Sequence, residues 1–446
     1  MTVMPPPVLK IAGDTALPAR VDVVVIGGGI AGVSAAYFLA KKGQTVALVE
    51  KGHIAGEQSS RNWGWCRTQN RDMRELPLQL LSMDIWDSLA TDIGGDTGFR
   101  RSGLIYATKS EADLATWSGW IDKARAYQVR NRVLSPAETK ALTPGNEQEW
   151  IGGIHAPTDG RAEPTMAAPA MAEAARALGV TLLQNCAVRG LDVAGGRVVG
   201  VITERGRIAA DAVLCAGGAW SSMLCRRHGI DLPQAGIRST VFATTVGPEV
   251  TPGGLVTPEF TLSRRLDGSY IVAAQDRGSL EFTPQGVRYA RQFWPTFKAR
   301  RKSLKIGIGR SFLEGPESVV GKWAMDKASP FERNRVFAPA PDTAIAAPAL
   351  AKVKAAYPGL SGLGIGGLWA GWIDMTPDGI PVISPVEKLP GFYLATGFSG
   401  HGFGIGPGAG RLAADLITGD PASVDPAPFR YSRLVDGTNL AAAGMM

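Results

Sequence analysis

The clearest pattern of apolar and polar residues lies between residues 20 and 50. Residues 21–26 form a short run of β-branched apolar residues, as expected of a strand that is buried on both faces. Residues 31–42 are good helix formers that stop at Gly43, and residues 45–49 form a second apolar run that ends at Glu50. This order predicts a strand, a helix and a second strand, which together make one βαβ unit.

Three glycines follow the first predicted strand with the spacing Gly27-x-Gly29-x-x-Gly32. Gly27 allows a tight turn, Gly29 lets the backbone approach a pyrophosphate, and Gly32 lets the helix pack closely on the strand. The N-terminus of the helix offers free N–H groups to phosphates, and Glu50 is placed to accept both hydroxyls of a ribose. The complete unit predicts a bound dinucleotide, and a glycine-rich turn without a ligand is the alternative.

Two later glycine-rich stretches indicate which dinucleotide is bound. Residues 209–221, AADAVLCAGGAWS, predict a strand that runs into a glycine turn and the start of a helix. Residues 396–410, TGFSGHGFGIGPGAG, predict a glycine loop before a helix at 411–417 that stops at Gly419. Such a loop suits a flat ligand that becomes negative on reduction beside a helix N-terminus, as a flavin does. The two stretches therefore favour FAD over NAD, with a flexible glycine loop as the alternative for the second stretch.

Composition narrows the class of protein. The chain has 446 residues, which is typical of two domains. The net charge of +7 is modest and the two signs are interspersed, so nucleic-acid binding is not expected. Cys66, Cys186, Cys215 and Cys225 show no metal-ligand spacing, so we expect neither disulfides nor a metal site. Neither a membrane span nor a signal-peptide pattern is visible, and we expect a cytoplasmic protein.

The order of GGGIAGVSAAYFLAKKG, VLCAGGAW, TPDGIPVI and GFSGHGFGIGPGAG resembles that in the D-amino-acid oxidase, glycine oxidase and sarcosine oxidase group of FAD-dependent oxidoreductases, over residues 20–420. The resemblance implies an α/β fold with a Rossmann-like FAD-binding domain built from discontinuous segments, plus an α+β substrate domain with a mixed sheet. The FAD-binding domain is expected at residues 20–95, 152–240 and 350–430, and the substrate-binding domain at 96–151 and 241–349. The FAD is expected to bind noncovalently or through a single side chain.

Local patterns agree with this organisation. Strands are expected at 103–108, 180–183, near Val188 and in a hairpin at 266–272, and helices at 111–128 and 164–178. Residues 338–351, rich in alanine and proline, are expected to cross back to the FAD-binding domain.

The glycine pattern and the resemblance together imply the residues that contact the FAD. Val188 is expected to give a backbone contact on the adenine side, and the loop that starts at Glu57 to pass under the isoalloxazine ring. The expected contacts are Gly27, Gly29, Ile30, Ala31, Gly32, Glu50, Lys51, Ser59, Ser60, Asn62, Trp63, Gly64, Val188, Gly217, Trp220, Gly371, Gly400, Gly402, Phe403 and Gly404.

On the substrate side, the resemblance implies that Arg67 lies close to the flavin, where a positive charge favours the anionic reduced form. Salt bridges from Arg67 and Arg71 to Asp72 and Glu75 are the alternative. His401 and Gln275 are expected to face the flavin. Among the lysines, Lys322 is a weak candidate for promoting a reaction with oxygen.

One departure from the family concerns the strand that contains Gly371. Amino-acid-oxidising relatives carry an arginine two residues after this glycine, where it holds the substrate carboxylate. This chain has Gly371-Trp372-Ile373-Asp374 instead. We therefore expect Asp374 to attract a second cationic group of the substrate, with cation–π contacts from the indoles of Trp63, Trp65, Trp369 and Trp372. The alternative for Asp374 is that it caps the turn or pairs with an arginine. The alternative for the tryptophans is that they are core residues, namely Trp63, Trp65, Trp369 and Trp372.

These expectations define an FAD-dependent amine or amino-acid oxidase or dehydrogenase. The resemblance implies oxidation of a C–N bond to an imine by hydride transfer to flavin N5, with Arg67, Asp374, His401, Trp372 and Gln275 as site residues. The substrate is a small amine or amino acid that carries an extra cationic group or lacks an α-carboxylate, and oxygen or an electron-transfer acceptor takes the electrons. The alternatives are oxidation of a 2-hydroxy acid, with His401 as the base, and a non-catalytic flavin-binding subunit.

Overall fold

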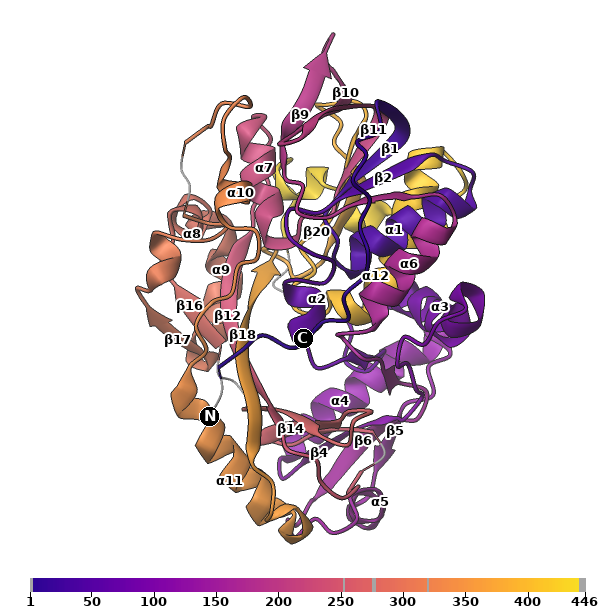
Figure 1. The fold of residues 1–446 in the computed structure, drawn as a ribbon. Coiled ribbons are helices and arrows are strands. Elements are labelled where there is room, and N and C mark those ends of the chain that lie inside the picture. Colours follow the sequence, from indigo (N-terminus) through magenta and orange to yellow (C-terminus); the bar gives the residue numbers. More distant parts are fainter. Residues whose placement is uncertain (1–2, 252, 275–277, 319–320, 441–446) are drawn as a thin grey trace.

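The computed structural model describes residues 3–440 except 252, 275–277 and 319–320. Two large sheets dominate this part of the chain (Figure 1). At its start Val3 forms a bridge with Leu368 of the second sheet, and at its end Leu440 packs on the core of the first sheet. A small two-stranded sheet, β3 (Trp65–Cys66) with β7 (Gly160–Arg161), lies apart from both. The expected fold class, a Rossmann-like unit plus a unit with a mixed sheet, is confirmed.

The first sheet contains the predicted βαβ unit. Its strand order is β19 (Val382–Pro385), β20 (Phe392–Thr396), β11 (Gly206–Cys215), β1 (Arg20–Ile26), β2 (Val46–Val49) and β8 (Thr181–Leu183). The pairs from β20 to β8 are parallel, and β19 is antiparallel to β20. From β11 the sheet continues through the antiparallel strands β10 (Arg197–Thr203) and β9 (Val188–Ala194). The carboxyl ends of β1, β2 and β11 therefore lie side by side, where α/β sheets bind ligands.

Helices cover one face of this sheet. They are α1 (Ile30–Lys41), α6 (Ala167–Ala177), α12 (Gly402–Thr418) and, packed on α12, α3 (Leu76–Ile93) (Figure 1). Val23 and Val25 of β1 belong to the core under these helices, and Val24 belongs to the core on the opposite face. A strand with both faces buried explains the continuous apolar run in the sequence.

The glycine stretch before residue 411 is mostly helix, and the expected loop is correspondingly shorter. Helix α12 begins at Gly402, and glycines 404, 406, 408 and 410 lie inside it. A Cβ atom on Gly410 would lie 2.4 Å from the Cβ atom of Ser34, and one on Gly406 would lie 2.8 Å from Cγ2 of Ile30. These glycines therefore allow α12 to pack closely on α1, and tertiary packing outweighs their low helix propensity.

The second sheet has mixed strand directions. Its order is β17 (Leu304–Gly307), β16 (Gly278–Glu281), β12 (Ala235–Thr244), β15 (Tyr270–Ala274), β14 (Phe260–Arg264), β13 (Gly254–Val256), β4 (Leu104–Thr108), β6 (Gly152–Ala156) and β5 (Arg132–Leu134), and β18 (Ile365–Met375) also pairs with β12. The pairs β13–β4 and β16–β17 are parallel. Helix α11 (Ala346–Ala356) buries its apolar side against Phe242 and Val272 of this sheet. Helices α4 (Glu111–Ala124) and α5 (Pro136–Leu142) flank its other end.

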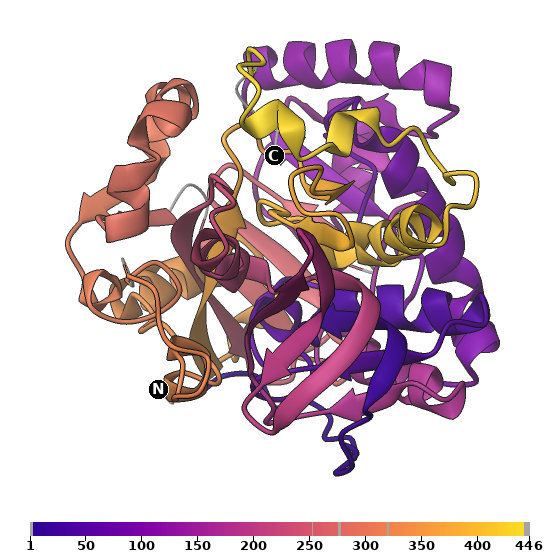
Figure 2. The ribbon, with the colours of Figure 1, turned by 90° about the horizontal axis from the view of Figure 1, so that it is seen from above.

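Three segments that the expected boundaries assign to the FAD-binding domain lie in the second sheet or on it. Strand β6 pairs with β4 and β5, and β18 pairs with β12 along its length. Helix α11 packs on the same sheet. These three segments therefore belong to or contact the second sheet, and the expected domain boundaries stay a prediction. Helix α2 (Gln58–Arg61) contacts β18, and α7 (Ser221–Arg227) and α10 (Pro330–Arg333) pack on the core of the first sheet. Helices α8 (Pro284–Arg288) and α9 (Ala290–Arg300) stand at the edge of the molecule (Figure 2).

The four cysteines are free and buried. Among the described residues, no helix is long and apolar enough to cross a membrane.

Candidate functional site

An open pocket lies at the carboxyl ends of β1, β2 and β11. Its lining comes from residues 26–29, 49–51, 55–59 and 215–220, together with Val188, Leu224 and Phe331. The empty volume, counted out to bulk solvent, is about 820 Å³. Eight of the expected FAD contacts line it, namely Gly27, Gly29, Glu50, Lys51, Ser59, Val188, Gly217 and Trp220.

The glycine turn fits a dinucleotide phosphate. Gly27 has a φ of +109°, and a Cβ atom there would lie 2.4 Å from the carbonyl oxygen of Ala216. A Cβ atom on Gly32 would lie 2.0 Å from the carbonyl oxygen of Gly27. The turn therefore brings the first residues of α1, Ile30 and Ala31, against the sheet, and the helix N-terminus meets the pocket.

Glu50 occupies the position expected of a ribose-binding acid. Its carboxylate accepts hydrogen bonds from the backbone N–H groups of Gly28 and Gly52, each at 2.7 Å. Burial raises the pKa of this carboxyl. The two backbone donors hold the carboxylate at the end of β2, in the pocket wall.

Glu57 was not expected as a cofactor-site residue, although it opens the stretch EQSSRNWGW. Its carboxylate accepts hydrogen bonds from Lys51 Nζ at 2.6 Å, from Trp220 Nε1 at 3.1 Å and from the backbone N–H of Phe337 at 3.0 Å. Lys51 Nζ lies 4.3 Å from the ring centroid of Trp220 and donates to the carbonyl oxygens of residues 334 and 335. Three distant chain segments therefore meet on one partly buried carboxylate at the pocket wall.

A second group of expected contacts lies where α2, β18 and the start of α12 meet. Gln58 Oε1 accepts a hydrogen bond from the backbone N–H of Trp372 at 2.7 Å, and a Cβ atom on Gly371 would lie 2.3 Å from the same oxygen. A Cβ atom on Gly400 would lie 3.4 Å from Ile373 Cγ2, and one on Gly404 2.8 Å from the carbonyl oxygen of Trp65. The absence of side chains at these glycines lets α2, β18 and the start of α12 pack closely against one another.

The remaining expected contacts surround this region. Ser60 donates to the carbonyl of Glu57, Asn62 caps the backbone N–H of Gly64 at 2.8 Å, and the Trp63 and Trp65 rings meet edge to face at 4.8 Å. Gly402 and Phe403 begin α12, whose N-terminal end carries a partial positive charge. If the isoalloxazine ring binds here, the N-terminus of α12 would supply a partial positive charge that stabilises a negative charge on the reduced ring.

Arg67 and Arg71 lie next to each other on the loop before α3, and both are buried. Arg67 Nη1 donates to the carbonyl oxygen of Gln69 at 2.5 Å and to the hydroxyl of Tyr106 at 2.9 Å. Arg71 Nε donates to the carbonyl oxygen of Arg67 at 3.3 Å. Within the described residues, neither guanidinium has a carboxylate within ion-pair distance, whereas Asp72 pairs with Arg74. The expected alternative of ordinary salt bridges at these two arginines is therefore wrong.

Burial and the neighbouring charge of Arg67 lower the pKa of Arg71 to about 9. A buried guanidinium without an ion pair is rare, because desolvating a charge is costly unless an anion compensates. The two arginines therefore form a desolvated positive site.

His401 precedes α12 and pairs with the residue that precedes α3. Its Nε2 lies 2.7 Å from Glu75 Oε1, and both side chains are buried. Burial lowers the pKa of His401, and the Glu75 charge opposes this shift. Arg71 and Arg67 also act on His401 through space, so the expected residue His401 shares one electrostatic site with the two arginines.

Asp374 and Trp372 are placed differently from the expectation that they bind substrate. Asp374 Oδ2 accepts a hydrogen bond from the backbone N–H of Gly397 at 2.9 Å, and burial raises its pKa to about 6. Trp372 is 2% exposed and packs on Phe337 with 5.7 Å between ring centroids. Both side chains alternate along β18 with Ile373, which lies beside Gly400. Asp374 thus bonds the backbone of the loop that follows β20, and Trp372 has the packing that a core residue requires.

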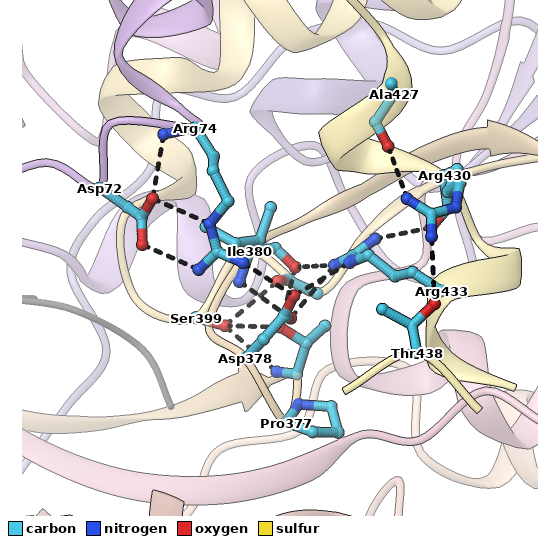
Figure 3. A network of polar contacts seen from close by, with 12 residues as sticks. Asp72, Arg74, Pro377, Asp378, Ile380, Ser399, Ala427, Arg430, Arg433 and Thr438 are labelled. Carbon is cyan, nitrogen blue, oxygen red and sulfur yellow. Dashed lines mark hydrogen bonds and ion pairs between the residues drawn. The ribbon is translucent and has the colours of Figure 1, made fainter. Parts of the chain in front are cut away.

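The turn after β18 is held by an ion network (Figure 3). Asp378, which is fully buried, accepts from Arg433 Nε at 3.0 Å and lies 3.6 Å from Arg74 Nη1. Ser399 Oγ accepts from the backbone N–H of Thr376 at 3.1 Å. The network ties the loop before α3, the turn and the C-terminal segment together, and it fixes the loop that carries His401.

Two further expected residues are Gln275 and Lys322. Gln275 lies outside the described residues. Lys322 is exposed and does not line the pocket.

The Rossmann-like sheet, the glycine cradle and the buried charged site define a two-unit, dinucleotide-dependent oxidoreductase. A family model described as FAD dependent oxidoreductase, DAO, matches residues 22–416, and the chain belongs to this family. FAD is therefore its cofactor, and the residues of the pocket fit it.

Similar proteins agree with this assignment. The sarcosine oxidase subunit beta of an Arthrobacter species is 27% identical over 426 residues, which cover 93% of this chain and 91% of that protein. Among solved structures, L-amino acid deaminase from Proteus myxofaciens, in complex with anthranilate, is 28% identical with a TM-score of 0.91, covering 97% of this chain and 98% of that one. L-amino acid deaminase from Proteus vulgaris is 29% identical with a TM-score of 0.89, covering 95% and 99%. The chain is an FAD-dependent oxidoreductase of the class that acts on amines and amino acids.

Proposed function

We propose that the substrate is an α-amino acid whose carboxylate binds Arg71, with Arg67 beside it. The observation that carries this proposal is the burial of Arg71, 4% exposed, with no ion-pair partner among the described residues. A substrate carboxylate supplies the missing anion, and a guanidinium can bind it through two parallel hydrogen bonds.

The electrostatics favour an anionic substrate group at this place. Arg67 and Arg71 repel each other, and the repulsion contributes to the lowered pKa of Arg71. Glu75 attracts Arg71 through space but is hydrogen-bonded to His401. A bound carboxylate relieves the repulsion without separating the Glu75–His401 pair.

The apolar residues nearby suit an apolar side chain. Ile373 stands where amino-acid-oxidising relatives carry an arginine, and it is partly exposed beside the glycine loop. Trp63 and Trp65 are partly exposed as well, and Trp63 packs with Trp369 in one apolar cluster. We propose that the carboxylate has moved from the β18 position to the arginines, and that the substrate side chain packs on these indoles.

An α-amino acid thus takes the place of the expected substrate, which would carry an extra cationic group. Such a group would have to meet Asp374, but this carboxylate accepts a hydrogen bond from Gly397 and lies on the opposite side of β18 from Ile373. Two similar solved structures are named L-amino acid deaminases, and their names support an α-amino acid as the substrate.

In this reaction the FAD supplies the two-electron acceptor for the α C–H bond. The protein binds the carboxylate at Arg71, excludes water with the indoles and keeps Nε2 of His401 engaged by Glu75. His401 Nδ1 is then the ring atom left to take or return a proton of the substrate amine.

The test is an anaerobic titration of the flavin-loaded protein, in which bleaching of the visible flavin band reports reduction. Matched pairs separate the hypotheses: leucine against isopentylamine, phenylalanine against phenethylamine, and both against the corresponding 2-hydroxy acids. We expect reduction by the amino acids and reduction at least about 10-fold weaker by the decarboxylated amines. Equal reduction by an amino acid and its amine would reject the carboxylate role, and reduction by hydroxy acids alone would reject amine oxidation. Admitting air afterwards distinguishes oxygen from another electron acceptor.

A further inference from the structure

Residues 282–313 form a surface that differs from the rest of the molecule; we name it the basic apolar surface. Among the described residues, seven of the 17 exposed large apolar side chains lie in this segment. Ile308 and Leu313 are each 81% exposed, and Val287, Trp294 and Phe282 are each more than half exposed. An apolar concentration of this kind on a protein surface marks an interaction site.

The same segment carries the positive charge of the protein. It holds eight of the 47 lysines and arginines and none of the 40 acidic residues. The rest of the chain therefore has 39 cationic and 40 acidic residues, so it is close to neutral, and the net charge of +7 comes from this segment. Five of the eight cations, Arg288, Arg291, Lys298, Arg301 and Lys302, form no ion pair with any described residue.

The segment projects from the body and is fastened at its base. Helices α8 and α9 and strand β17 stand at the edge of the molecule in Figure 1, and Figure 2 shows α8 and α9 in coral, clear of the rest of the ribbon. At the base, Thr283 Oγ1 donates a hydrogen bond to Glu317 Oε2 at 2.6 Å. This contact joins the start of the segment to the chain that directly follows its end. Thr296 Oγ1 donates to the carbonyl oxygen of Pro377 at 2.5 Å. The segment is thus ordered against the turn after β18, with its cations and apolar side chains directed outward.

We propose that the basic apolar surface docks on an anionic lipid bilayer. Cations near a bilayer bind headgroup phosphates, while adjacent Trp, Phe, Leu and Ile side chains enter the boundary with the acyl chains. A nucleic acid would use aromatic side chains for base stacking, but Val287, Ile306, Ile308 and Leu313 are aliphatic and cannot stack. A purely electrostatic protein contact would leave these aliphatic side chains without a function. The docking is peripheral, since it requires no membrane-spanning helix.

The experiment is co-sedimentation of the flavin-loaded, full-length chain with vesicles of phosphatidylcholine alone or of phosphatidylcholine with phosphatidylglycerol. We expect binding to the anionic vesicles, weak binding to the neutral ones, and release as salt screens the charges. The double variant Arg301→Gln/Lys302→Gln is expected to lower the partition coefficient about 30-fold. The double variant Ile308→Ser/Leu313→Ser is expected to lower it about 10-fold or more.

Matched controls change exposed residues of the same types elsewhere. Lys123→Gln/Arg130→Gln and Leu178→Ser/Val193→Ser are expected to bind vesicles like the unmodified chain, and flavin absorbance verifies that all variants are folded. Equal binding to neutral and anionic vesicles, or equal losses in the control variants, would overturn the proposal. So would an absence of vesicle binding combined with a dimer that Ile308→Ser/Leu313→Ser dissociates, since a second copy of the chain would then cover the surface.

Discussion

His401 Nε2 lies 2.7 Å from Glu75 Oε1, and this contact joins the start of α12 to the start of α3 across 326 sequence positions. Both side chains are buried, so the pair is shielded from water and salt. Arg71 and Arg67 act on the same histidine. The pair therefore connects the α12 N-terminus, which we expect to face the flavin, with the proposed carboxylate site.

The first prediction concerns the pH dependence of flavin reduction. Burial lowers the pKa of His401 and the Glu75 charge raises it, so Glu75→Gln removes a contribution that favours the charged imidazole. We expect the limb of the pH–rate profile that belongs to His401 to move to lower pH in Glu75→Gln. Anaerobic stopped-flow reduction at a series of pH values measures it. Glu75→Asp, which keeps the charge, is the control. If the limb stayed at the same pH in Glu75→Gln, the Glu75–His401 pair would have no part in flavin reduction.

Arg71→Gln tests the carboxylate site. We expect the KM for the preferred amino acid to rise about 10- to 100-fold, the range for losing charged hydrogen bonds. The decarboxylated amine with the same side chain should react equally well with both proteins. Steady-state kinetics gives the ratio of the KM of Arg71→Gln to that of the unmodified protein for each of the two substrates. A matched rise for both substrates would indicate a general structural defect rather than a lost carboxylate contact.

Asp374→Asn distinguishes a structural role from a substrate role. Burial raises the pKa of Asp374 from 3.8 to about 6, so the folded protein holds a proton that the unfolded chain releases at lower pH. Its contribution to the free energy of unfolding therefore falls as pH rises from about 4 to about 6. We expect Asp374→Asn to lose this pH dependence while the KM for substrate stays unchanged. Thermal unfolding of both proteins across this range measures the first effect, and a large rise in KM for a cationic amine would restore Asp374 to the substrate site.

Gly32→Ala tests the glycine cradle. The new methyl group would lie 2.0 Å from the carbonyl oxygen of Gly27, so the turn must shift away from the phosphate position. We expect loss of most bound FAD, read as the ratio of flavin to protein absorbance. Gly119→Ala, in α4 with no atom near its added methyl, should retain the flavin and be at least as stable as the unmodified protein, because alanine favours a helix more than glycine does.

The network in Figure 3 predicts a large stability effect. Arg433→Met leaves the buried carboxylate of Asp378 without its closest cation. Removing one partner of a buried pair typically lowers the free energy of unfolding by about 3–5 kcal/mol. Urea unfolding measures this loss. Arg433→Met combined with Asp378→Asn should be less destabilised than Arg433→Met alone, and equal values would show that the pair is not coupled.

The sequence by itself determined the parts of the protein that depend on local geometry. The βαβ unit follows from apolar periodicity within residues 20–50, and the steric limit at Gly32 acts within this unit, against the carbonyl oxygen of Gly27. Glu50 follows from the same unit, because the end of a strand fixes where its next side chain lies. The order of the motifs was enough to predict the family and the FAD cofactor.

The tertiary structure decided which face of a strand meets the ligand, and it decided which partner each buried polar group has. Trp372, Ile373 and Asp374 alternate along β18, but a strand that is apolar on both faces does not show which face meets the ligand. Glycine disfavours isolated helix, so the sequence predicted a loop where packing on α1 makes the first turns of α12. The contacts Glu75–His401, Tyr106–Arg67 and Glu57–Phe337 could not be read from the sequence, because each joins residues that lie far apart in the chain and meet only when it is folded.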